Sequence, residues 1–98
     1  MKSVVQVIPR DDYKVYVYFL DGYIKLYDAK PLVSKGIFRQ IQDPLVFKNS
    51  CTVMNHTLAW DLYGTRDPQT CLDLDPDQVF EQGLSVDDPL EHFNGKLV

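Results

Sequence analysis

The sequence predicts one α+β domain, made mainly of antiparallel strands with short helices packed on them. Residues 3–28 are dense in Val, Ile, Tyr and Phe, which favour strands. Two turn signals divide the first part of the chain into hairpins, and two Asp-Pro pairs mark the starts of short helices. Because 98 residues suffice for one core but not for two, we expect a single domain over residues 1–83, followed by a tail.

The first strands are expected at residues 3–8 and on both sides of Asp21-Gly22. This pair suits the positive φ angles of a two-residue hairpin turn, which places Leu20 opposite Tyr23. Side chains alternate between the two faces of a strand, so this register also sorts the faces. The core face then carries Val15, Val17, Phe19, Ile24 and Leu26. The opposite face carries Leu20 and five residues that we call the tyrosine face: Tyr16, Tyr18, Tyr23, Lys25 and Tyr27.

After this hairpin, isolated prolines and glycines limit the chain to short helical pieces. Ile37, Phe38 and Ile41 have the spacing of a buried helical stripe. Asp43-Pro44 predicts a further helix, with aspartate as the N-cap and proline in the first helical position.

A second hairpin is expected around Asn55-His56, because apolar, β-prone residues flank this pair on both sides. The pairing places Val53 opposite Leu58 and Cys51 opposite Trp60. A single Trp on an apolar strand is expected in the core, and a place at an interface is the alternative.

The C-terminal part of the domain is expected to hold one more helix. Asp75-Pro76 repeats the cap-plus-proline signature and predicts a helix over residues 76–82, closed by Gly83 in the left-handed conformation. Residues 84–98 are expected to form a tail that is a short helix or partly disordered. Within it, residues 85–88 have the outline of a capping box.

Composition and cysteine content place the chain among ordinary globular proteins. Apolar residues make up 45% and charged residues 24%. No apolar run approaches the roughly 20 residues of a membrane span, and charged residues interrupt any signal-like segment at the start. Cys51 and Cys71 allow at most one bridge and are expected to be reduced thiols. We therefore expect a cytoplasmic protein.

The net charge of −4 hides an asymmetry between the two halves. Residues 1–50 carry eight basic and five acidic side chains, whereas residues 51–98 carry two basic and nine acidic ones. Such a split can mark a surface that faces a partner.

No catalytic, metal-binding or cofactor-binding constellation is visible, so we expect no cofactor and no enzymatic activity. His56 lies at a hairpin tip and His92 in the tail, where no packed scaffold orients a catalytic base. Cys51, His56 and Cys71 lack the paired spacing of a zinc site. The acidic run from Asp73 lacks the glycine and glutamate of a calcium loop. One alternative remains open: an enzyme whose paired carboxylates meet in a cleft.

The tyrosine face allows several interpretations. Each tyrosine can bury about 150–250 Å² while its hydroxyl stays wet, so an open face would be a large patch for a monomer. The face is covered either by the domain's own helices or strands, or by a protein partner, which is a second copy or a toxin-like protein. A weaker alternative is nucleic-acid binding through the tyrosines with Lys14 and Lys25, although a pI of about 4.9 gives no general attraction to phosphate.

The order of these features resembles a family of small bacterial proteins known as domain of unknown function 2442, over residues 1–83. The resemblance rests on Val4 to Val7, Phe19 to Gly22, Gly36-Ile37-Phe38 with Asp43-Pro44, Trp60, and most specifically the run from Asp73 to Phe80. The chain departs from the family pattern in a longer link between Trp60 and Leu72, and in Val79-Phe80 where many members have Leu-Tyr.

The resemblance implies a small α+β domain and transfers no catalytic or ligand-binding residue. It also implies a partner, because family members often look like the companion of a small toxin-like protein. We therefore expect a protein-interaction module, antitoxin-like in function, with the tyrosine face as its contact surface.

Overall fold

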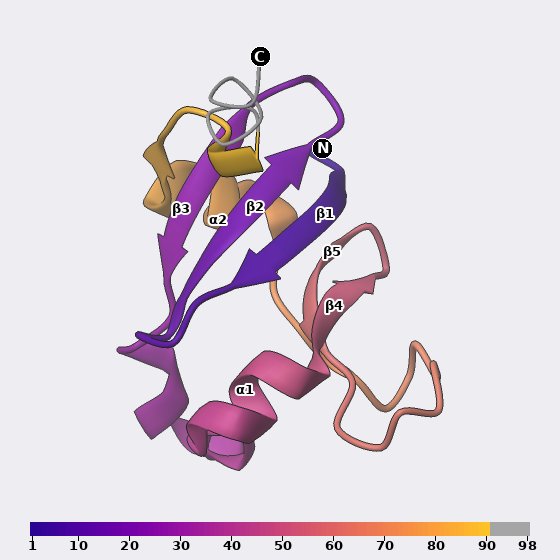
Figure 1. Cartoon of the computed structure of the whole chain (residues 1–98). Coiled ribbons are helices and arrows are strands. Elements are labelled where there is room, and N and C mark those ends of the chain that lie inside the picture. Colours follow the sequence, from indigo (N-terminus) through magenta and orange to yellow (C-terminus); the bar gives the residue numbers. More distant parts are fainter. Residues whose placement is uncertain (91–98) are drawn as a thin grey trace.

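Two antiparallel sheets and several short helices make up the fold in the computed structural model, which describes residues 1–90 (Figure 1). The four-stranded sheet has the order β1-β2-β3-β7, and the three-stranded sheet has the order β4-β5-β6. The first comprises β1 (Val4–Pro9), β2 (Lys14–Phe19), β3 (Ile24–Asp28) and β7 (Leu84–Ser85). The second comprises β4 (Cys51–Met54), β5 (Thr57–Trp60) and β6 (Leu72–Asp73). The predicted α+β class is confirmed.

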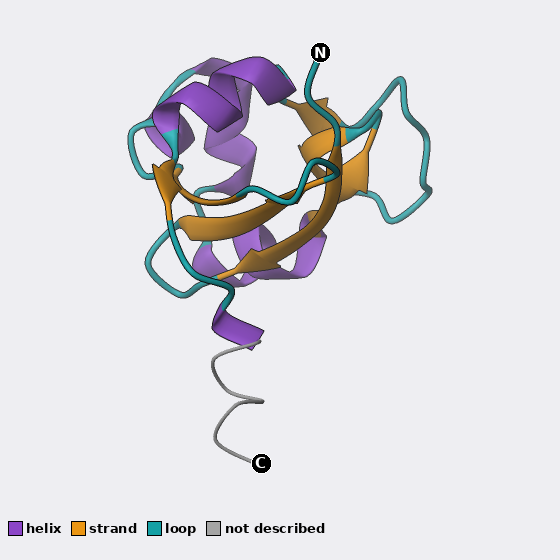
Figure 2. Ribbon diagram, turned by 90° about the horizontal axis from the view of Figure 1, so that it is seen from above, coloured by secondary structure: helices purple, strands orange, loops and turns teal. Residues whose placement is uncertain are grey.

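The helices lie in two places along the chain. The 3₁₀ helices η1 (Leu32–Ser34) and η2 (Gly36–Ile41) and the helix α1 (Pro44–Ser50) connect the two sheets, and α2 (Pro76–Gln82) precedes β7. Helix α2 lies against one face of the four-stranded sheet (Figures 1 and 2).

Both predicted Asp-Pro helix starts are confirmed. The carboxylate of Asp43 accepts a hydrogen bond from the amide of Leu45, and that of Asp75 accepts one from the amide of Asp77, each at 2.9 Å. Each aspartate thereby satisfies an amide that has no partner within its helix.

The expected apolar stripe over residues 37–41 is only partly buried. Ile41 is fully buried and Phe38 half-buried, whereas Ile37 is 62% exposed. The segment is a 3₁₀ helix, in which residues three apart share a side, so Phe38 and Ile41 face the core together and Ile37 does not.

The predicted register of the first hairpin is wrong by one residue. The amide of Phe19 donates to the carbonyl of Tyr23 at 2.9 Å, and the amide of Gly22 donates to the carbonyl of Phe19 at 3.0 Å. The loop therefore has three residues, 20–22, with Gly22 in the left-handed conformation at φ 95°. In this loop the glycine occupies the third position instead of the second.

This shift exchanges the two faces of β3. Tyr18 lies opposite Ile24, and Tyr16 lies opposite Leu26. Ile24 and Leu26 therefore share a face with the two tyrosines instead of joining the core face, while Tyr27 is opposite Val15 and is 7% exposed.

The second hairpin has the predicted register, with Val53 opposite Leu58. Asn55 and His56 have φ angles of 56° and 61°, as a two-residue turn with two positive φ angles requires. The carbonyl of His56 also accepts a hydrogen bond from the amide of Val4 at 2.9 Å, which joins this turn to the first strand of the other sheet.

The core lies where the sheets and helices meet. Trp60 is fully buried, as predicted, with its ring centroid 5.5 Å from that of Phe47 and 6.3 Å from that of Phe38. Val15 and Val17 from β2 are also completely buried. These contacts tie α1 and η2 to the strands.

Gly83 ends α2 differently from the prediction. Its φ and ψ are −77° and 153°, which is extended rather than left-handed. A Cβ at this position would lie 2.8 Å from the Cβ of Lys25, so the residue is small because β3 passes close by. The chain continues directly into β7, where Leu84 pairs with Leu26 and Ser85 with Lys25. Ser85 is thus a strand residue, and the expected capping box over residues 85–88 is wrong.

The expected boundary at Gly83 falls immediately before this strand. The expectation that the end of the chain forms a helix or is disordered concerns mainly residues 91–98, which lie outside the described residues, as does His92.

Candidate contact surface

The five residues of the predicted tyrosine face lie on two different faces of the four-stranded sheet, which corrects the prediction. Tyr16 and Tyr18 lie on the face opposite α2, whereas Tyr23, Lys25 and Tyr27 lie on the side of α2. We call the first the outer face. Its apolar and aromatic residues, in order of the strands, are Ile8, Tyr16, Tyr18, Ile24, Leu26 and Leu84.

The three residues on the inner side are held by the domain itself. Tyr27 is buried, and burial raises the pKa of its phenol. The ring of Tyr23 meets that of Phe80 edge to face at 5.1 Å. The ammonium of Lys25 lies 4.3 Å from the centroid of Phe80 and donates to the hydroxyl of Ser85 at 2.9 Å. The tyrosine-and-lysine strip considered for nucleic-acid stacking is therefore not assembled on one face.

Tyr18 on the outer face is tied to the end of the described chain. Its hydroxyl donates to Oδ1 of Asp88 at 2.6 Å. Burial, and then the hydrogen bond to this carboxylate, raise the pKa of Tyr18 to about 12. No local pattern in the sequence reveals this contact, because the two residues are 70 positions apart.

The chain after β7 crosses the outer face. The amide of Val86 donates to the carbonyl of Ile24 at 3.1 Å. In Figure 2 the short helical turn that ends the described chain lies on the side of the sheet opposite α2. Between this segment and the sheet there is a pocket of about 410 Å³, lined by Tyr16, Val86, Asp87, Asp88 and Pro89.

The outer face keeps accessible apolar surface beside this pocket. Tyr16, Ile24 and Leu26 are half-buried, and Leu84 is 69% exposed. The guanidinium of Arg10 lies 5.8 Å from the centroid of the Tyr16 ring, near enough for a cation–π contact. The surface can therefore offer apolar contacts together with both signs of charge.

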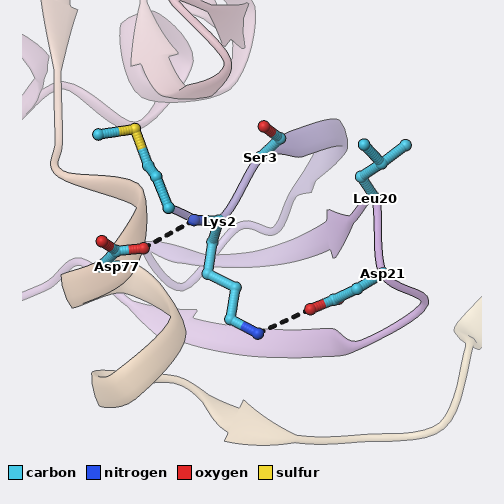
Figure 3. Close-up of a pocket in the computed structure, with 6 residues that line it drawn as sticks. Lys2, Ser3, Leu20, Asp21 and Asp77 are labelled. Atoms are coloured by element: carbon cyan, nitrogen blue, oxygen red, sulfur yellow. Dashed lines mark hydrogen bonds and ion pairs between the residues drawn. The ribbon is translucent and has the colours of Figure 1, made fainter.

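A second pocket brings two carboxylates together and bears on the alternative of a carboxylate enzyme (Figure 3). It measures about 470 Å³, and Asp21 and Asp77 are among its lining residues. Lys2 lies between them: its amide donates to Oδ1 of Asp77 at 2.8 Å, and its ammonium is 2.7 Å from Oδ2 of Asp21.

This arrangement is better suited to fixing the N-terminal segment than to acid–base catalysis. The hydrogen bond from Lys2 lowers the pKa of Asp21, so this carboxyl is a weak proton acceptor. A general acid or base working near neutral pH needs a pKa shifted the other way.

The thiols and the described histidine show no catalytic arrangement. Cys51 and Cys71 are free, and burial raises the pKa of Cys51 to about 12, which keeps its sulfur protonated. His56 is exposed at its hairpin tip, as expected. Within residues 1–90 no group of three or more His, Cys, Asp or Glu side chains is placed to hold a metal ion.

Comparison with known proteins identifies the family. The model of a protein family described as "Protein of unknown function (DUF2442)" matches residues 4–84. The chain belongs to the DUF2442 family. No curated protein and no solved structure matches it. The part matched to DUF2442 spans both sheets and α2 and ends inside β7, so the segment that carries Asp88 over Tyr18 lies beyond it. None of the helices formed by residues 1–90 of this DUF2442 protein has the length and apolar character of a membrane span.

Proposed function

We propose that the domain is a non-enzymatic protein-interaction module and that the outer face is its contact surface. The observation that carries this proposal is the uneven cover of the four-stranded sheet. Its inner face packs against α2 and the core, whereas its outer face bears half-buried apolar residues crossed by the chain after β7.

The residues of this face suit a protein contact. Tyr16 and Tyr18 provide large, stiff side chains with a polar end, a type that is enriched at protein interfaces. Leu84 lies on the same face, separated from Tyr16 by Leu26 of β3, and is largely exposed. A partner that covers the face would gain apolar burial from all three residues.

A basic partner fits the charges best. Asp87 and Asp88 line the outer-face pocket, and the cation beside it, Arg10, is already paired with Asp12 at 2.8 Å. Complementary charge would speed association and select the partner. The family resemblance points to a small toxin-like protein, which the acidic surface would neutralise as an antitoxin does. The free thiols support a reducing compartment, so we place both proteins in the cytoplasm.

The test is co-purification of the full chain with the product of the adjacent gene, followed by co-expression to measure the growth defect that this product causes. Leu84→Glu should reduce the recovered partner at least tenfold. Ile37→Glu is the matched control, because Ile37 in η2 is an apolar residue of similar exposure, at 62% against 69% for Leu84.

The proposal fails if the adjacent product neither binds nor becomes less toxic, or if the two variants behave alike. Light scattering of the isolated chain tests whether a second copy of the chain covers the outer face instead. A dimer that dissociates in the Leu84→Glu variant would assign the face to that second copy.

A further inference from the structure

A third pocket lies between α1 and the loop after β5, away from the outer face. It measures about 420 Å³, within the range of about 300–1,000 Å³ usual for ligand sites. Among its lining residues, Leu45 and Tyr63 are each 70% exposed, whereas Ser50 and Asp61 are buried. The exposed pair therefore forms an apolar rim, and the buried pair forms a polar floor.

Asp61 has an incomplete set of hydrogen bonds. The residue is only 8% exposed. Its Oδ2 accepts a hydrogen bond from the amide of Arg66 at 3.0 Å, while its Oδ1 is buried and has no hydrogen-bond partner in the described part of the chain. A buried carboxylate oxygen without a donor is costly, so unpaired ones are rare in native proteins.

The neighbouring groups do not supply the missing donor. The guanidinium of Arg66 is directed elsewhere, to the hydroxyl of Thr52 at 2.9 Å and the carbonyl of Val53 at 3.3 Å. The hydroxyl of Ser50 donates to the carbonyl of Val46 at 2.5 Å. None of the ion pairs formed within residues 1–90 includes Asp61.

We propose that this pocket binds a guanidinium or primary ammonium group carried on an apolar stem. The stem packs against Leu45 and Tyr63, and the cation donates to Asp61, which is the only charged residue in the lining. Because Oδ1 is buried in the unbound chain, binding requires the Asp61 side chain to turn this oxygen toward the bound group. The chemistry is that of an arginine or lysine side chain in a protein, or of a free amine or guanidine. The site uses none of the outer-face residues, so it stands independently of the function proposed above.

The experiment titrates the full chain with small probes while amide resonances are followed by NMR. The probes are Nα-acetyl-arginine methylamide, its lysine counterpart and its citrulline counterpart, which has nearly the shape of the arginine probe but no charge. Saturable shifts are expected around Ser50 and residues 61–64 with the two cationic probes, with binding at least tenfold weaker for the citrulline probe.

Two variants separate cation binding from a role in folding. Asp61→Asn keeps an oxygen for the amide of Arg66 but removes the charge, and it should weaken binding of the arginine probe at least tenfold. Tyr63→Ala, at the exposed rim, should weaken binding severalfold without lowering the melting temperature, and it keeps the test decisive if Asp61→Asn fails to fold. Leu84→Glu on the outer face should bind the probes like the natural chain.

The proposal is overturned if neither cationic probe gives saturable shifts, if the citrulline probe binds as well as the arginine probe, or if a folded Asp61→Asn chain binds unchanged. Two further probes identify the source of the cation. Tighter binding of a pentapeptide with central arginine supports a protein side chain, and tighter binding of agmatine supports a free guanidine.

Discussion

Replacing Gly83 with alanine is expected to destabilise the domain because of space, although the backbone angles at this position suit any residue. The new methyl group would lie 2.8 Å from the Cβ of Lys25 and 3.0 Å from the carbonyl oxygen of Val79. Neither atom is the mobile end of a side chain, so α2 and β3 must move apart. Such overpacking costs about 1–3 kcal/mol.

Part of this cost is offset in the unfolded chain. Replacing glycine by alanine restricts the unfolded backbone and stabilises the fold by about 0.4–1 kcal/mol. At the middle of the two ranges the net loss is about 1.3 kcal/mol, which for a domain of this size lowers the melting temperature by about 5–10 °C. Urea unfolding followed by the fluorescence of Trp60, which is completely buried, measures the stability of the natural chain and of the Gly83→Ala chain in the same signal.

Gly22 provides the contrasting case. It has φ 95°, and a methyl group added there would meet no atom within 4 Å, so only its conformation restricts substitution. Asparagine tolerates positive φ better than alanine. Asn should therefore be milder than Ala at Gly22 and more damaging than Ala at Gly83. A Gly83→Ala chain as stable as the natural one, or the same order of effects at both sites, would refute the steric explanation.

Three further predictions concern the caps, the phenol and the thiols. Asp75→Ala should cost about 1 kcal/mol of unfolding free energy and Asp75→Ser much less, because serine also caps a helix; urea unfolding checks this. Tyr18 should titrate near pH 12 instead of 10 in an ultraviolet titration compared with Tyr18→Phe. As the pH rises, the phenol of Tyr18 loses its proton in the unfolded chain before it does so in the folded chain. The stabilisation that the protonated phenol gives the folded chain is therefore complete below pH 10 and is lost between pH 10 and 12. In the folded chain, Cys51 should resist a thiol reagent at pH 8 longer than the more accessible Cys71, which single Cys→Ser variants will reveal.

Local chemistry made the caps and the second hairpin predictable. An aspartate before proline can satisfy a helix amide through its own side chain, and Asn55-His56 sits between two β-prone runs. These features depend on residues within a few positions of one another, so the sequence pattern carries them directly.

The features that the sequence did not reveal depend on distant parts of the chain. In the sequence, Gly83 has the position of a glycine that ends a helix. In the structure, a side chain is excluded there because Lys25 of β3, far earlier in the chain, lies too close. The contact between Tyr18 and Asp88, and the unpaired Oδ1 of Asp61, likewise appear only when separate segments meet. Of the outer face, only the β2 residues could be predicted, because each side chain of β3 lies on the opposite face of the sheet from the one expected.

The three-residue loop at 20–22 has a consequence for how this domain can vary. Side chains on a strand alternate with an exact period of two, so the identity of the buried set in β3 depends on whether the loop holds an odd or an even number of residues. Losing one codon there would present Ile24 and Leu26 to the core and turn Tyr27 to the surface. Insertions and deletions at this tip are therefore tolerable in pairs and disruptive singly, and loop length is under tighter constraint than loop composition.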